Sequence, residues 1–246
     1  MTANLRTAMV LAAGHGTRLR PLTDRMPKPM MPVNGKPLID HTLDRLAAFG
    51  IEHAVVNTHH LAEQVERHLA GRRAPQIAIS REETILDTGG GIANALPQLG
   101  DDAFLAVNAK IVWLDGRIPA LQRLAACWDD SRMDGLLLVH PTVMARAYDG
   151  PGDFFLDPEG HVRRRRHWEV APFVYTGIQI LHPRLFADAP DTGSRRAFSM
   201  NELYDRAIEA GRLFGLRHDG EWFQVSTAAH VEIIEAALAA LGFAAA

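Results

Sequence analysis

Cysteine is nearly absent from the sequence, and long apolar runs are missing altogether. The 246 residues contain one cysteine, Cys127, so neither an internal disulfide nor a cysteine metal cluster can form. No apolar run reaches the roughly 18 residues that cross a membrane, and no signal-peptide core precedes the first predicted strand. We therefore expect a cytoplasmic protein without a membrane partner, in which Cys127 is a buried, inert thiol on an apolar helix face.

Charge and motif content exclude further classes of function. The formal net charge is -3, so the chain lacks the basic excess of a general nucleic-acid binder, and any cationic site must be local. The 12 histidines include no H-x-x-x-H or H-E-x-x-H pair, and no G-x-S-x-G elbow is present. The sequence thus supports neither a histidine metal site nor hydrolysis through an acyl-enzyme.

Predicted strands and helices alternate along the chain. Apolar spacing predicts helices over residues 37–49 and 88–96, the second ending before Pro97. Further signals predict strands at 8–11, 51–58, 76–80, 103–107, 135–140, 173–181, 213–217 and 222–225, with a hairpin at 152–166. The alternation is typical of a three-layer, Rossmann-like α/β fold with a mostly parallel mixed sheet. We expect one domain over residues 1–246, with an insertion at about 150–200.

A strand that opens into a bare glycine loop is the most informative feature of the chain. The apolar run at 8–11 leads into Gly14 and Gly16, and the cations Arg18 and Lys28 follow. Glycines allow positive φ and close approach of backbone N–H groups to an anion, and the cations could bind a polyphosphate. Both the third glycine of the dinucleotide fingerprint and the G-K-[ST] of a P-loop are missing. An ordinary βα turn with surface cations is the alternative.

Residues 11–23 (LAAGHGTRLRPLT), followed by Pro-Lys-Pro at 27–29, resemble the signature of the sugar-nucleotide pyrophosphorylases. These nucleotidyltransferases join a nucleoside triphosphate to a sugar 1-phosphate and release pyrophosphate. Within that family the chain most resembles short bacterial members, the uridylyltransferases acting on N-acetylmuramic acid 1-phosphate and mannose-1-phosphate guanylyltransferase-like proteins. The resemblance implies UTP and an amino sugar 1-phosphate as substrates, in a monomer or homodimer.

The resemblance also implies roles for individual residues at the nucleotide. Arg18 would neutralise the β and γ phosphates, Lys28 the α-phosphate, and Asn108 would orient the acceptor. The glycines of the T-G-G-G stretch at 88–91 would meet the base, although a tight turn with a helix N-cap is the alternative. The residues placed at the nucleotide are Leu11, Ala13, Gly14, Gly16, Thr17, Gly89, Gly90 and Asn108.

On the sugar side, the resemblance points to Glu169 and to the Y-T-G-I string at 175–178. Thr176 and Gly177 would approach the sugar ring, with a strand bulge as the alternative for the glycine. Relatives often carry a lysine after the glutamate, which meets the sugar phosphate, whereas this chain has Glu169-Val170. The cation for that phosphate is therefore open, and the arginines at 163–166 are the nearest candidates.

Two positions depart from the family pattern at its magnesium site. The family carries aspartates in N-x-D and W-x-D strings, where this chain has Lys110 and Gln224. Magnesium prefers oxygen ligands, and an ammonium cannot bind it, so Mg²⁺ is expected from the family but is doubtful here. The substitution at 110 changes the local charge by two units, and each unit pair is worth about 4 kcal/mol at 4 Å and an effective dielectric of 20.

Three explanations are open at this point. Lys110 could act as a catalytic cation alongside Arg18 and Lys28, so that transfer runs without magnesium or with metal held by the phosphates alone. Alternatively, the chain could be a catalytically silent homologue that binds nucleotide or nucleotide-sugar as a sensor or partner subunit. The two substitutions could also have been introduced to trap a complex.

Overall fold

Parallel strands form the centre of the sheet in the computed structural model, which describes residues 3–187, 189 and 196–243. Strand β1 (Thr7–Leu11) lies between β4 (His53–Thr58) and β6 (Phe104–Asn108) and runs parallel to both. Strand β5 (Gln76–Arg81) continues the parallel arrangement beyond β4. The central strands β1 and β6 are mostly apolar and buried, as expected for parallel strands that are covered on both faces.

Antiparallel pairing extends the sheet on the other side of β6. Strand β11 (Phe173–Leu181) is antiparallel to both β6 and β8 (Gly135–Pro141), and β12 (Leu213–Arg217) is parallel to β8. The hairpin of β9 (Phe154–Leu156) and β10 (Val162–Arg164) joins the edge next to β11. Within the described residues, nine strands form this sheet, with the path β10-β9-β11-β6-β1-β4-β5 and with β8 and β12 branching from β11.

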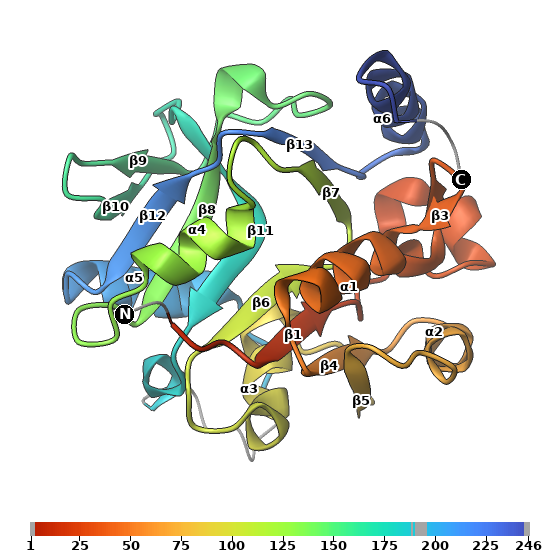
Figure 1. Cartoon of the computed structure of the whole chain (residues 1–246), viewed down its shortest axis with the longest axis horizontal. Coiled ribbons are helices and arrows are strands. Elements are labelled where there is room, and N and C mark those ends of the chain that lie inside the picture. Colours follow the sequence, from red (N-terminus) through yellow and green to blue (C-terminus); the bar gives the residue numbers. More distant parts are fainter. Residues whose placement is uncertain (1–2, 188, 190–195, 244–246) are drawn as a thin grey trace.

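Helices cover both faces of the sheet (Figure 1). Buried side chains of α1 (Leu38–Phe49), α2 (Ala62–Leu69) and α4 (Ala120–Cys127) pack in one core cluster. Those of α3 (Asp87–Leu99) and α5 (Met200–Glu209) pack in a second cluster. This arrangement confirms the predicted three-layer α/β class.

A third, smaller core cluster lies beside α1. Helix α6 (Ala228–Ala240) packs there on the two-stranded pairs β2 (Pro32–Val33) with β3 (Lys36–Pro37), and β7 (Ile111–Leu114) with β13 (Glu221–Gln224). The 3₁₀ turns are η1 (Thr17–Leu19), η2 (Leu22–Asp24), η3 (Lys28–Met30), η4 (Thr142–Met144) and η5 (Pro183–Phe186). In the part of the chain that the structure describes, no helix is both long and apolar enough to span a membrane.

Two local predictions from the sequence are wrong. Helix α3 continues through Pro97 to Leu99, because a proline in the last turn removes only one helical hydrogen bond. Cys127 is exposed, since α4 ends at this residue and Trp128 takes the next buried position. Partial desolvation still raises the pKa of the Cys127 thiol, which keeps it in its unreactive form.

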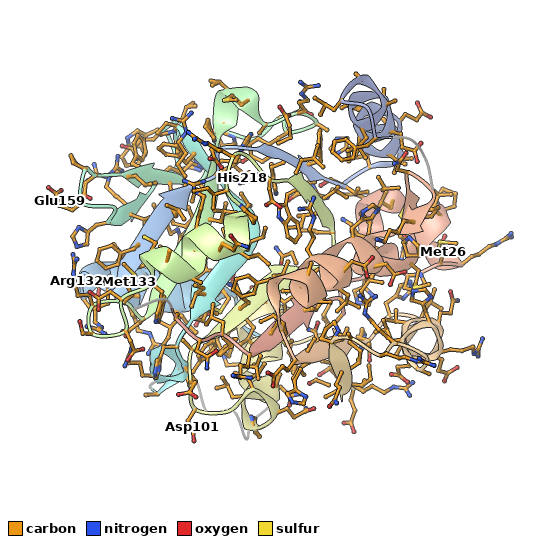
Figure 2. All side chains as sticks on the ribbon, in the orientation of Figure 1. Met26, Asp101, Arg132, Met133, Glu159 and His218 are labelled. Atoms are coloured by element: carbon orange, nitrogen blue, oxygen red, sulfur yellow. The ribbon has the colours of Figure 1, made fainter. Side chains whose placement is uncertain are left out.

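Two histidines are buried where β8 meets the segment between β12 and β13. The rings of His140 and His218 lie 5.8 Å apart, and each residue is 1% exposed. Figure 2 labels His218 near the ribbons of β8 and β13. Among the described residues, neither ring nitrogen of His140 has a hydrogen-bond partner. Burial, with a smaller contribution from His218, lowers the pKa of His140 to about 4.

The low pKa of His140 predicts a loss of stability in mild acid. The folded chain binds fewer protons than the unfolded chain between pH 6.5 and about 4, so the free energy of unfolding falls as the pH decreases through this window. About 2.5 pKa units correspond to about 3 kcal/mol. A His140→Leu variant should lose this part of the pH dependence in urea titrations at pH 7 and pH 4, whereas His53→Leu, at an exposed position, should keep it. If His140→Leu and the parent chain lost the same unfolding free energy between pH 7 and pH 4, the prediction would be contradicted.

Candidate active site

The C-terminal ends of β1 and β6 bring the two halves of the candidate site together. Leu11 is in register with Asn108, and the backbone N–H of Ala109 donates to the carbonyl of Leu11 at 3.0 Å. The loop after each strand therefore begins at the same edge of the sheet. In open α/β sheets this edge is where ligands bind.

Gly16 shapes the loop that follows β1. Its φ is +64°, and a Cβ at this position would lie 2.9 Å from Thr23 Cγ2 and 3.2 Å from Lys28 Cβ. The Thr23 hydroxyl also donates to the carbonyl of Gly16 at 3.0 Å. Gly14 is not in the left-handed region, and a Cβ there would meet open space. Glycine is thus required at position 16 because a side chain there would prevent the loop from packing against Thr23 and Lys28.

A cavity of about 290 Å³ opens at this edge. It is lined by Leu11, Ala12, Ala13, Gly14, Gly16, Thr17, Arg18, Lys28, Pro29, Asn57, Glu82, Ile85, Asp87, Thr88, Asn108, Ala109, Lys110 and Ser226. The structure therefore brings together every nucleotide-side residue predicted from the sequence except the two glycines at 89 and 90.

Three cations face this cavity. Among the described residues, the side chains of Arg18, Lys28 and Lys110 have no hydrogen-bond or ion-pair partner. Burial, reinforced by Lys110 and Arg18, lowers the pKa of Lys28 to about 7. Burial and Arg18 also lower the pKa of Lys110, which Asp153 partly offsets. Such a cluster of unpaired positive charge is suited to a polyanion.

Gly89 and Gly90 lie outside the residues that line the cavity. Their N–H groups donate to the carbonyl of Phe198 at 2.9 and 3.1 Å. A Cβ on Gly89 would lie 2.4 Å from the Phe198 ring, and one on Gly90 would lie 2.9 Å from the carbonyl oxygen of Arg196. Close packing of α3 against this segment is thus a sufficient reason for both glycines.

A second cavity, of about 570 Å³, adjoins the first. It is lined by Leu11, Thr88, Asn108, Asp153, Phe154, Arg164, Arg165, His167, Tyr175, Gln179, Ser199, Met200, Asn201 and Tyr204. Leu11, Thr88 and Asn108 line both cavities. The site can therefore hold two ligands side by side, with Asn108 between them.

The predicted sugar-side residues Glu169, Thr176 and Gly177 are not among the residues that line the second cavity. Thr176 is buried, and its hydroxyl donates to the carbonyl of Leu138 at 2.7 Å. Gly177 lies at a bulge between β11 and β8, with a φ of +85°. A Cβ there would lie 2.7 Å from Asn108 Nδ2. Glu169 accepts hydrogen bonds from Arg163 Nη1 and the Arg166 N–H, both at 2.7 Å. The cavity wall itself includes Tyr175 of the same string.

A buried polar chain that the sequence did not reveal connects the loop after β1 to the segment before α3. Ala12 N–H donates to Asn57 Oδ1 at 2.6 Å, and Asn57 Nδ2 donates to Glu82 Oε1 at 2.7 Å. The second carboxylate oxygen of Glu82 accepts the Leu86 N–H at 2.9 Å. Burial raises the pKa of Glu82, and these hydrogen bonds oppose that shift. Both side chains line the first cavity and rigidify its wall.

The donor set at the family's metal positions does not fit Mg²⁺. Lys110 supplies an ammonium, and Gln224 Nε2 donates to Ser226 Oγ at 2.8 Å within its own loop. Across the residues that the structure describes, no group of three or more His, Cys, Asp or Glu side chains could hold a metal ion. Ser226 lines the cavity in place of Gln224, and its O–H remains available to donate.

Comparisons with known proteins agree with this geometry. The family model described as nucleotidyl transferase matches residues 7–145. The N-acetylmuramate alpha-1-phosphate uridylyltransferase of Caulobacter vibrioides is 43% identical over 89% of this chain and 91% of its own length. A protein of the same name from Neisseria meningitidis is 34% identical over 93% of this chain and 96% of its own.

Solved structures share the fold at low sequence identity. The structure described as a putative glucose-1-phosphate thymidylyltransferase from Bacillus anthracis superposes with a TM-score of 0.79. It is 16% identical, and the match covers 94% of each chain. These similarities, together with the two adjoining cavities, are the basis for assigning the family.

Proposed function

The chain belongs to the nucleotidyl transferase family, and from this premise we propose that it joins UTP to N-acetylmuramate 1-phosphate and releases pyrophosphate. It is a sugar-1-phosphate nucleotidyltransferase. The observation that carries the proposal is the pair of adjoining cavities, of about 290 and 570 Å³, on either side of Asn108. Transfer requires room for a nucleotide and a sugar phosphate together, whereas a homologue that only bound a nucleotide would need the first cavity alone. The choice of uridine and of N-acetylmuramate is supported by the names of the relatives.

The mechanism follows from positioning and charge. A phosphate oxygen of the sugar 1-phosphate attacks the α-phosphorus in line, and pyrophosphate leaves on the opposite side. Arg18 and Lys28 would neutralise the triphosphate, and backbone N–H groups of the loop after β1 would approach its oxygens. Asn108 would hold the acceptor at the boundary between the cavities.

The cation for the sugar phosphate is Arg165 in this proposal. Arg163 is paired with Glu169, and Arg164 donates to both carboxylate oxygens of Asp205 at 2.8 and 2.7 Å. Arg165 lines the second cavity and donates only to backbone carbonyls, those of Arg166 and His167 at 3.2 Å and of Glu169 at 3.5 Å. Its positive charge therefore has no ion-pair partner among the described residues.

An Arg165→Ala variant should show a selective loss of sugar 1-phosphate binding. We expect the KM for the sugar 1-phosphate to rise about 10- to 100-fold, since a charge-assisted contact contributes roughly 1.5–3 kcal/mol. The KM for UTP should be unchanged, because Arg165 does not line the first cavity. Steady-state pyrophosphate release measures both constants. Arg163→Ala is the matched control, and an equal effect of the two variants would contradict the assignment.

Pyrophosphate release from a substrate panel tests the overall activity. The chain would be assayed with UTP, CTP, GTP and dTTP, each combined with the 1-phosphates of N-acetylmuramate, N-acetylglucosamine, glucose and mannose. UTP with N-acetylmuramate 1-phosphate should give the highest kcat/KM, and mass spectrometry should identify the nucleotide sugar. No release from any pair, together with tight UTP binding in calorimetry, would instead support the silent homologue.

A further inference from the structure

Lys110 is held rigidly at the edge where the two cavities meet. It follows Ala109, whose N–H donates to the carbonyl of Leu11, and its own carbonyl accepts the N–H of Val225 at 3.0 Å. The backbone is thus fixed both to the end of β1 and to the segment after β13. The side chain lines the first cavity, two residues after Asn108, which lines both.

The charges that face the Lys110 ammonium are Arg18, Lys28 and Asp153. Asp153 is the one carboxylate among them, and it lines the second cavity. Its own position is fixed, because Asp153 Oδ2 accepts the Tyr175 N–H at 2.8 Å and its carbonyl accepts the Arg165 N–H at 2.9 Å. Arg164 and Arg165 are the other charged groups near this carboxylate. Lys110 in the first cavity and Asp153 in the second are therefore near enough for the carboxylate to stabilise the ammonium, without an ion pair between them in the described part of the chain.

We propose that the Lys110 ammonium, whose charge the nearby Asp153 carboxylate stabilises, supplies the positive charge at the α-phosphate, so that this chain transfers the nucleotidyl group without a protein-bound metal. The inference rests on the proposed function and specifies how its site works. Lys110 donates N–H hydrogen bonds to non-bridging oxygens of the α-phosphate, where charge must be stabilised during transfer. Lys110 is thus a catalytic residue, and Asp153 is a positioning residue.

The step balances without a metal or a proton donor. One oxygen of the sugar 1-phosphate forms a bond to the α-phosphorus, and the bond from the α-phosphorus to the bridging oxygen breaks. Pyrophosphate leaves with that electron pair, no group is oxidised or reduced, and Lys110 stays protonated throughout. The hydroxyl of Ser226, which lines the same cavity, can donate to a phosphate oxygen as well.

Chelation distinguishes the two sources of charge. Pyrophosphate release from UTP and N-acetylmuramate 1-phosphate would be measured with excess EDTA and with millimolar Mg²⁺. The unchanged chain should keep its rate within about threefold in EDTA. The Lys110→Asp/Gln224→Asp double variant should lose at least about 100-fold in EDTA and recover with Mg²⁺. A rate for the unchanged chain that collapses in EDTA would overturn the inference while leaving the proposed function intact.

Calorimetry with UTP gives a second readout that needs no turnover. The unchanged chain should bind UTP in EDTA at least as tightly as in Mg²⁺. The double variant should bind UTP more tightly in Mg²⁺ than in EDTA. If binding follows this pattern and no substrate pair releases pyrophosphate, the proposed function fails and the assignment of Lys110 as the phosphate-binding cation stands. UTP binding by the unchanged chain that requires Mg²⁺ would overturn that assignment.

The pH profile tests the positioning role of Asp153. Removing the facing carboxylate in Asp153→Asn should move the upper limb of the kcat/KM profile to lower pH, because the protonated form of Lys110 loses its stabilising neighbour. Asp153→Glu should return the upper limb of the kcat/KM profile to its original pH. Asp205→Asn is the matched control, since Asp205 pairs with Arg164 at the rim, and its profile should stay in place. A lower stability or a higher sugar KM for Asp153→Asn with an unmoved profile would contradict the positioning role.

Discussion

Replacing Lys28 by methionine is expected to lower kcat/KM for pyrophosphate release about 1,000-fold. The ammonium lines the nucleotide cavity without an ion-pair partner among the described residues, so its charge is available to the triphosphate. A unit charge about 4 Å from a phosphate oxygen is worth about 4 kcal/mol at an effective dielectric of 20. Since each factor of ten corresponds to about 1.36 kcal/mol, the loss is about three orders of magnitude.

Stability should respond to the Lys28 substitution in the opposite direction. Burial and the neighbouring cations lower the pKa of Lys28 to about 7, so folding opposes protonation of this group. The empty protein should therefore unfold at the same temperature or higher after Lys28→Met. Lys36→Met is the matched control, because Lys36 is paired with Asp44 away from the cavity, and it should leave kcat/KM unchanged. Equal losses of activity for the two variants, or unfolding of Lys28→Met, would contradict this role.

The residues predicted from the loop after β1 lie together in the structure because the determinants of that loop are local. The loop after β1 is one continuous stretch, and its conformation depends on Gly16 and on residues at most 12 positions away, Thr23 and Lys28. The predicted residues from Leu11 to Lys28 accordingly line one cavity. Lys110 joins them because β6 pairs with β1 in the sheet.

The rest of the site depends on long-range packing that composition does not encode. In the sequence, Asn57 and Glu82 look like ordinary polar residues at strand ends. They form a buried hydrogen-bonded chain only because β1, β4 and β5 pair in the sheet. Asp153 lies in the predicted hairpin region, and its electrostatic effect on Lys110 depends on how the fold places the two cavities. Strand β7 was not predicted either, since its four residues directly follow the site loop and pair with β13 across more than 100 positions.

Gly89 and Gly177 show that a glycine motif can have a packing reason beside a ligand one. Both are predicted to approach a ligand, and in the structure each also accommodates a protein neighbour, the Phe198 ring for Gly89 and the Asn108 side chain for Gly177. A glycine motif indicates that the position has no room for a Cβ, but the sequence does not show which neighbouring group occupies that space. Gly177 is therefore tied to function through Asn108, the residue between the two cavities.

This link predicts that Gly177→Ala will lower kcat/KM about 100-fold. The new Cβ would lie 2.7 Å from Asn108 Nδ2 and 3.0 Å from Asn108 Cβ, so the Asn108 side chain must move. A displacement of about 1 Å in a positioning residue can cost about 100-fold in rate. The backbone adds strain, because a φ of +85° costs a non-glycine residue roughly 1–3 kcal/mol. Kinetics and urea unfolding should both show losses.

Gly211→Ala separates the strain from the displacement. Gly211 has a φ of +66°, and a Cβ there would have no heavy atom within 4 Å outside its own chain neighbours. The variant should therefore lose a similar 1–3 kcal/mol of unfolding free energy from strain while keeping kcat/KM. If Gly177→Ala also kept kcat/KM, Asn108 would not be needed at its observed position. If both variants lost activity equally, the loss would follow from reduced stability, so only a selective effect of Gly177→Ala supports Asn108 as the residue that aligns the two substrates.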